Sequence, residues 1–339
     1  MAERFLDLPP GERADILQAM AARLGRTAII LEKDVWVCWT LGTLFGLANR
    51  EAMAFKGGTS LSKVYGAISR FSEDLDVTVD CRRQVEPFDP FSPNASMTAQ
   101  RRHSDRLSEA MARHVREVVA PGLAEELARQ FGGATRIEVD GGAENLRVHY
   151  ESAIPPAAGY VDRSILVEFG GRNSLEPSES RTIEPYLAAQ VPSLEFPMAR
   201  VDVLRGERTF WEKATLIHVE CGRGELRPGR ERLSRHWYDL ARLAGHDIGR
   251  RAVPDRALLA DVVRFKKVFY RAGYGNYDAC ASGGLRLVPA EPMLASLRED
   301  FAQMVASGMF EGEPPVFDEI IERLGELEQE INGSPSRGA

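Results

Sequence analysis

Apolar residues follow a helical period at both ends of the chain and a strand period in its middle. They recur at helical spacing from residue 10 to about residue 49, and residues 30–47 form the second predicted helix. Short apolar runs predict strands at residues 53–55, 74–79, 135–140, 146–151, 164–169 and 199–204. From residue 207 onward helices are predicted at residues 207–219, 235–245, 255–270, 292–307 and 316–331. The pattern therefore predicts an α/β fold of the α+β kind, with helices around a mixed sheet.

The remaining stretches suggest how the chain is divided. Residues 82–104 are polar and contain proline, which predicts a loop, and a helix over residues 105–130 is expected to kink or break near Pro121. We expect an N-terminal helical segment at residues 1–49, a core at 50–205, a C-terminal helical lobe at 206–331 and a disordered tail at 332–339.

Composition narrows the class of protein. The 339 residues are 44% hydrophobic and 27% charged, which is ordinary for a soluble globular protein. No signal peptide or membrane-length apolar run is recognisable, so no membrane partner is expected. The four cysteines have no paired spacing, which suits a reducing cytoplasm, and His218, Cys221 and His236 match no zinc pattern. A net charge of −7 argues against nucleic-acid binding over the whole surface.

Residues 55–76, FKGGTSLSKVYGAISRFSEDLD, carry the strongest chemical signal. The Gly-Gly-Thr-Ser turn at residues 57–60 opens a helix predicted over residues 62–68, and the free N–H groups of a helix start favour an anion. Asp74 and Asp76 share one face of the following strand, because successive side chains alternate. Adjacent carboxylates repel each other unless a cation separates them, and Mg²⁺ prefers such oxygen ligands together with phosphates.

Neither signal is specific by itself, since such turns cap ordinary helices and Asp-x-Asp is common at solvated strand ends. Together, in this order, they are typical of a nucleotidyltransferase core of the polymerase-beta type. The turn is not a Walker loop, because no Gly-Lys-Ser/Thr follows it. A metal pair also needs a third carboxylate on a neighbouring strand. Glu168 is the first candidate and Asp202 the second, although Glu168 could instead be a surface residue of an edge strand.

Several segments carry a family resemblance. They are EKDVWV at residues 32–37, FKGGTSLSK at 55–63, RFSEDLD at 70–76, ERTFWEK at 207–213 with His218, and RHWYDL at 235–240. Together they resemble the AbiEii/AbiGii family of nucleotidyltransferase toxins, whose relatives include the MenT toxins. The resemblance implies a polymerase-beta-type core and Mg²⁺-dependent transfer of NMP from an NTP to an RNA acceptor, with tRNA as the expected acceptor. It also implies a cognate antitoxin encoded by a neighbouring gene.

The expected roles follow from these motifs. Asp74, Asp76 and Glu168 are predicted to be catalytic and to bind the metal. The residues expected to bind nucleotide or phosphate are Gly57, Gly58, Thr59, Ser60, Lys63, Ser72, Lys213 and Asp239, with Lys56 a weaker candidate. Thr209 and Glu212 fit a capping box at a helix start, and Asp239 can pair with Arg235 four residues earlier.

A loop with five arginines between residues 223 and 235 gives a local basic patch. Arginines next to a nucleotidyl-transfer site suit an RNA backbone, and the predicted RNA-binding residues are Arg227, Arg230, Arg232 and Arg235. A solvated loop that pairs with this chain's own acids is the alternative.

Two other functions remain open from the sequence. A transferase that modifies a protein or a small molecule would have no use for the arginine loop. A non-catalytic binding or regulatory protein would have no need of the Gly-Gly-Thr-Ser turn and the Asp-x-Asp pair.

Overall fold

The computed structural model describes residues 3–72, 74–132, 135–155, 163–226 and 232–333. The chain forms two compact units. The first comprises Met1–Val64, Ser72–Pro87 and Asp105–Leu204, and the second comprises Tyr65–Phe71, Phe88–Ser104 and Arg205–Ala339.

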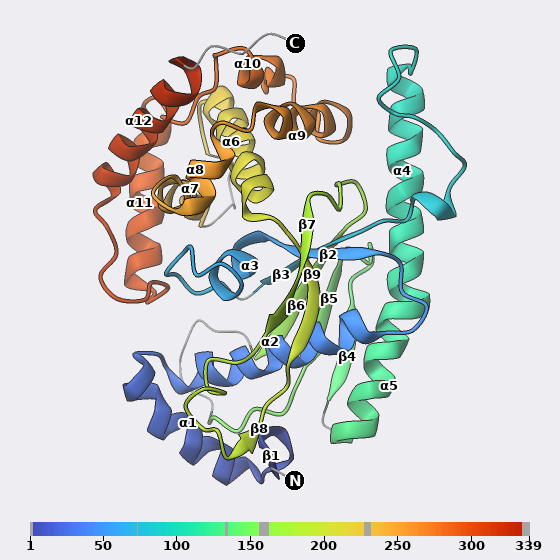
Figure 1. The fold of residues 1–339 in the computed structure, drawn as a ribbon, viewed down its shortest axis with the longest axis vertical. Helices are drawn as coiled ribbons and strands as arrows, with labels where there is room; N and C mark the ends of the chain where they lie inside the picture. Colours follow the sequence, from blue (N-terminus) through green and yellow to red (C-terminus); the bar gives the residue numbers. More distant parts are fainter. Residues whose placement is uncertain (1–2, 73, 133–134, 156–162, 227–231, 334–339) are drawn as a thin grey trace. The chain divides into compact units, whose positions relative to one another are not determined.

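A seven-stranded mixed sheet is the centre of the first unit (Figure 1). Its strand order is β4 (Arg136–Val139), β5 (Asn145–His149), β6 (Ser164–Gly170), β3 (Asp74–Val79), β2 (Met53–Lys56), β9 (Ala199–Leu204) and β7 (Ser178–Ile183). The pairs β3–β6 and β2–β9 are parallel, and the other pairs are antiparallel. A separate two-stranded sheet joins β1 (Glu3–Arg4) to β8 (Leu194–Glu195).

One face of the large sheet is apolar and the other is polar. Leu75, Val77, Val167 and Val203 are all fully buried on the apolar face. The helix α2 (Ala28–Gly46) lies across the sheet and contacts β9 and β6 (Figure 1). Buried and half-buried residues alternate along β5 and along the first four residues of β3, as a sheet covered on one face requires.

The first unit also contains α1 (Pro10–Leu24), α3 (Gly57–Lys63) and α5 (Ala120–Phe131). The helices α1 and α2 pack together around a core that includes Leu17, Leu31 and Val35. Trp36 on α2 stacks on Tyr150, with ring centroids 4.8 Å apart, and meets the edge of Phe131 at 4.9 Å. These aromatic contacts join α2 to α5 and to the end of β5.

The second unit contains helices α6 to α12. Their bounds are α6 (Gly206–Arg223), α7 (Arg235–Ala244), α8 (Asp247–Ala252), α9 (Arg256–Phe269), α10 (Tyr277–Ala281), α11 (Met293–Ala306) and α12 (Phe317–Gly333). The fully buried Trp211 and Trp237 fill this unit, and their indole N–H groups donate to the carbonyls of Ala252 and Leu287. Each indole therefore buries a large ring without leaving its donor unsatisfied.

The strands predicted at residues 74–79 and 199–204 are confirmed, but several boundaries were wrong. The predicted loop at 82–104 is partly helical, because α4 (Met97–His114) begins within it. Ser96 starts this helix, since its hydroxyl accepts a hydrogen bond from the N–H of Ala99. The helix after the Gly-Gly-Thr-Ser turn covers residues 57–63 rather than 62–68.

Two further findings concern irregular segments. The interruption expected near Pro121 is confirmed, because a π-helical turn at Val115–Val119 separates α4 from α5, and Pro121 lies in the first turn of α5. The edge strand β7 was missed because its sequence, SESRTI, is largely polar. The tail predicted to be disordered lies, from residue 334, outside the described residues.

Among the described residues, no helix is both long enough and apolar enough to cross a bilayer. Even the apolar α2 carries the charged residues Glu32, Lys33 and Asp34 in its first half.

Replacing Trp36 by alanine should destabilise the first unit. The side chain is 1% exposed and contacts three aromatic rings, so its removal leaves a large cavity. We expect the free energy of unfolding to fall by about 3–5 kcal/mol, measured from the urea transition by circular dichroism. Met198→Ala is the control, because Met198 is 66% exposed and should change that free energy by less than about 0.5 kcal/mol.

Candidate active site

Two neighbouring strands bring three carboxylates to the polar face of the sheet. In the parallel register of β3 and β6, Asp76 lies opposite Glu168 and Asp74 lies opposite Leu166. Asp74 and Asp76 are half-buried and Glu168 is exposed, whereas their strand neighbours Leu75 and Val167 are buried. The three acids therefore share one face. Glu168 is not on an edge strand, because β6 pairs with β5 on its other side.

The register also distinguishes Glu168 from Asp202. Asp202 lies on β9, and β2 separates β9 from β3. Since neighbouring strands are about 4.8 Å apart, Asp202 is about two strand spacings from the Asp-x-Asp strand, whereas Glu168 is one spacing away. Of the two candidates for the third carboxylate, Glu168 is thus closer to Asp76.

The helix α3 contacts β3, the strand that carries Asp74 and Asp76. Gly57 has a φ of +79°, and a Cβ atom there would lie 1.9 Å from Oδ2 of Asp76. The hydroxyl of Thr59 donates to the carbonyls of Asp74 at 2.6 Å and Ser72 at 3.1 Å. The first turn of α3 and the Asp-x-Asp strand consequently form one packed unit.

The other residues of the turn serve this local structure. The Ser60 hydroxyl donates to the carbonyl of Gly57 at 2.9 Å, and Gly58, Thr59 and Ser60 are buried. Ser72 is half-buried, and its carbonyl accepts the hydrogen bond from the Thr59 hydroxyl. Glu73, the next residue, lies outside the described residues.

The two lysines next to the turn have different surroundings. Lys56 lies opposite Asp76 in the β2–β3 register and is half-buried, so it shares a row with Asp76 and Glu168. The Lys63 side chain is 4% exposed, and its ammonium lies 2.6 Å from the carboxylate of Asp34. Burial is the largest single effect and lowers the pKa of the Lys63 ammonium, but Asp34, Cys38 and Tyr186 together outweigh it, so the pKa is raised.

The acids suit a hard divalent cation by donor type and by backbone position. Carboxylate oxygens are the ligands that Mg²⁺ prefers, and the register sets two of the acids side by side. Among the described residues, however, no three His, Cys, Asp or Glu side chains gather closely enough to hold a metal ion. The backbone positions of the acids therefore suit a bound cation, but their carboxylate side chains would have to rotate toward it.

A second group of charges lies within the second unit. Arg70 forms a bidentate pair with Asp239, with both N–O distances 2.7 Å, and the Lys213 ammonium lies 2.8 Å from the same carboxylate. The expected pairing of Asp239 with Arg235 is replaced by these two partners. Sequence reasoning missed Arg70, although it begins the RFSEDLD motif.

The capping box predicted at Thr209 is wrong. The helix α6 begins at Gly206, so Thr209 is inside the helix rather than at its start. Its hydroxyl is buried and has no hydrogen-bond partner among the described residues. Glu212 instead pairs with Arg208 at 3.4 Å.

Electrostatic effects in this cluster are large because it is buried. Burial alone would raise the pKa of Asp239, but Arg70 and Lys213 hold that pKa well below its usual range. Burial, with help from Arg70, lowers the pKa of Lys213. Burial and the nearby Lys213 and Arg235 lower the pKa of His236 well below its usual value, so this imidazole is neutral at pH 7.

The structure describes only part of the predicted RNA-binding loop. Arg227 and Arg230 lie outside the described residues. The backbone N–H of Arg232 donates to Asp300 at 2.6 Å, and the half-buried Arg235 is the first residue of α7.

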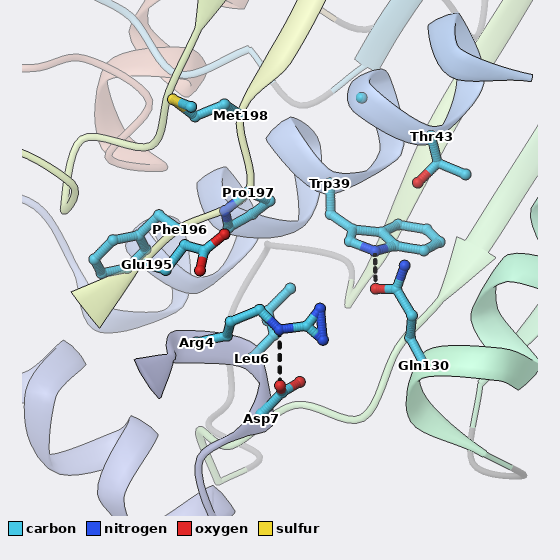
Figure 2. A pocket seen from close by; sticks show the side chains of 11 residues that line it. Arg4, Leu6, Asp7, Trp39, Thr43, Gln130, Glu195, Phe196, Pro197 and Met198 are labelled. Atoms are coloured by element: carbon cyan, nitrogen blue, oxygen red, sulfur yellow. Dashed lines mark hydrogen bonds and ion pairs between the residues drawn. The ribbon is translucent and has the colours of Figure 1, made fainter. Parts of the chain in front are cut away.

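A cavity of about 350 Å³ lies elsewhere in the first unit (Figure 2). Trp39 and Gln130 line it and are joined by a 2.9 Å hydrogen bond, and Arg4 and Asp7, which also line it, form an ion pair. Its lining includes none of the predicted site residues.

Four buried or half-buried histidines should make the protein less stable in mild acid. His114, His218 and His246 each accept a backbone N–H, which only an unprotonated nitrogen can do, and burial lowers the pKa of all three and of His236. Below the usual histidine pKa of 6.5 the unfolded chain binds protons that the folded chain does not. The free energy of unfolding should therefore fall between pH 7 and pH 5.

His236→Phe tests this, because phenylalanine fills a similar volume and does not titrate. We expect the pH dependence of the free energy of unfolding to become shallower by up to about 1.4 kcal/mol per pH unit, measured from urea transitions at several pH values. An unchanged slope would contradict a neutral, buried His236.

Comparisons with known proteins place the chain in a family. The family model described as "Nucleotidyl transferase AbiEii toxin, Type IV TA system" matches residues 43–323, which include Gly57, both aspartates of the Asp-x-Asp pair and Glu168. No curated protein matches. Among solved structures, MenT4, a nucleotidyltransferase toxin from Mycobacterium tuberculosis H37Rv, is similar with a TM-score of 0.49 and 17% identity, over 97% of this chain and 91% of that one. Because the family model matches most of its length, the chain belongs to the AbiEii family of nucleotidyl transferase toxins of type IV toxin–antitoxin systems.

Proposed function

We propose that this nucleotidyltransferase transfers NMP from an NTP to an RNA acceptor, with tRNA as the acceptor and Mg²⁺ as the metal. The observation that carries the proposal is the register of β3 and β6, which sets Asp76 beside Glu168 and on the same face as Asp74. These carboxylates would hold the metal, which when bound neutralises charge on the transferred phosphoryl group.

The chain's own residues have distinct roles in this proposal. The Gly-Gly-Thr-Ser turn holds the acid strand in place through Gly57 and Thr59 and offers the first N–H groups of α3 toward the triphosphate. Lys56, in the same row as Asp76, supplies positive charge next to the acids. Ser72, at the start of the acid segment, is assigned to phosphate contact.

From the second unit we assign Lys213 and Asp239 to nucleotide binding, on the family resemblance of the segments that carry them. Asp239 orients Lys213 through the 2.8 Å ion pair, and Lys213 stabilises triphosphate charge. Arg227, Arg230, Arg232 and Arg235 are assigned to the acceptor RNA.

The toxin family implies an antitoxin partner. We further propose that the protein acts in the cytoplasm. All four cysteines are free, and Cys38, Cys81 and Cys280 are buried, which is usual where thiols stay reduced.

Label transfer tests the reaction and its third carboxylate together. Purified protein is incubated with Mg²⁺, total tRNA and each α-labelled NTP in turn. We expect label in tRNA from one NTP, and a loss of at least about 100-fold in Asp76→Asn and Glu168→Gln, because metal-held charge is worth several kcal/mol in the transition state. Asp202→Asn, on the same face but two strands from β3, is the matched control and should retain activity.

Other outcomes would redirect the assignment. Label on the protein alone would indicate protein modification, and a large loss in Asp202→Asn with an active Glu168→Gln would exchange the two acids. Absence of label in every acceptor would contradict the proposal.

Gly57→Ala should reduce activity far more than stability. A methyl group at this position collides with the Asp76 carboxylate, which must then leave its place. Gly25→Ala is the matched control, because Gly25 has a similar φ of +63° and nothing within 4 Å of the added methyl.

A positive φ strains any residue that has a Cβ, so we expect the free energy of unfolding of both variants to fall by about 1 kcal/mol for this reason. Only Gly57→Ala should lose at least about 10-fold in transfer rate. Equal transfer rates in the two variants would show that the contact with Asp76 has no role in catalysis.

A further inference from the structure

Lys63 ends α3 in an enclosed site that contains no part of the carboxylate row. Its ammonium lies 2.6 Å from Oδ1 of Asp34, donates to the carbonyl of Glu184 at 2.8 Å and lies 4.0 Å from the ring centroid of Tyr186. The Lys63 and Asp34 side chains are only 4% and 6% exposed. A lysine held in this way would have to break its ion pair before it could bind a triphosphate.

Asp34 joins three separate segments of the first unit. Its Oδ1 binds Lys63 at the end of α3, and its Oδ2 accepts the backbone N–H of Tyr186 at 2.7 Å. Asp34 itself belongs to α2, which covers the apolar face of the sheet. One carboxylate thus connects α2, α3 and the turn that follows β7.

The two ends of α3 have complementary contacts. At its start, Gly57 lies against the Asp76 carboxylate and Thr59 bonds to the backbone of β3. At its end, Lys63 is bound to α2 through Asp34. Because α3 is only seven residues long, about 10 Å, a displacement of one end moves the other.

We propose that Asp34 and Lys63 are positioning residues, whose buried ion pair holds α3 so that Gly57 keeps the Asp76 carboxylate in place. The effect on rate rests on the proposed function, whereas the effect on α3 does not. This assignment replaces the sequence-based prediction that Lys63 binds phosphate.

The test compares Asp34→Asn, Lys63→Met and the double variant. Transfer kinetics are measured with Mg²⁺ and tRNA, and amide hydrogen exchange of residues 57–64 is measured on the same proteins. We expect each single variant to lose at least 10-fold in kcat with little change in KM for the NTP. The double variant should be no worse than the more affected single variant, because both substitutions break the same pair.

Hydrogen exchange in residues 57–64 should be at least 10-fold faster in Asp34→Asn. Lys63→Arg keeps the charge pair and should restore most of kcat, which guards against a Lys63→Met protein that does not fold. Arg26→Gln is the matched control, because Arg26 stacks on the same Tyr186 ring at 3.8 Å, and α3 exchange should stay unchanged.

Two results would overturn the proposal. A KM for the NTP that rises 10-fold in Lys63→Met but not in Asp34→Asn would show that Lys63 contacts the triphosphate. Unchanged exchange in residues 57–64 of Asp34→Asn would show that the pair does not hold α3. If the parent protein transferred no label, the proposed function would fail, and the exchange measurement would still decide this inference.

Discussion

The close contact between Gly57 and Asp76 is the constraint on which the arrangement of the site depends. The chain leaves β2, turns with a positive φ at Gly57 and enters α3 directly over the carboxylate of the neighbouring strand. Any Cβ at this position would overlap Asp76, so glycine is required both for the backbone conformation and for the space. The positions of the Gly-Gly-Thr-Ser turn and of the Asp-x-Asp strand therefore constrain each other.

Three buried acidic side chains have partners that orient them. Asp34 binds Lys63, Asp239 binds Arg70 and Lys213, and Glu32 accepts hydrogen bonds from Ser152 and the N–H of Ala153. Such pairs add little net stability, because removing charges from water costs about as much as the attraction returns. Breaking one is nevertheless costly, since it leaves a single charge buried. Their value here is geometric, because each pair ties together segments that are distant in sequence.

The two faces of the sheet have different roles: one packs against helices, and the other carries the predicted site residues. The apolar face, with Leu75, Val77 and Val203, packs against helices and contributes the core. The polar face carries the acids and Lys56, none of which is needed for packing of the core. The alternating polar and apolar residues of segment 74–79 predicted a strand, and the strand is confirmed. The same pattern predicts that Asp74 and Asp76 bind a metal, and this stays a prediction.

The sequence by itself determined the alternation of β3, the order of helices and strands, and the proximity of the Gly-Gly-Thr-Ser turn to the Asp-x-Asp pair, because these depend on residues close together in the chain. Only the tertiary structure decided which acid is nearest to Asp76, since strand order sets Glu168 one spacing away and Asp202 two. It also decided that Lys63 pairs with Asp34 and that Arg70 pairs with Asp239, 29 and 169 residues away in the chain. Local sequence patterns cannot predict these ion pairs, because burial and strand register are set only when the helices and strands pack together.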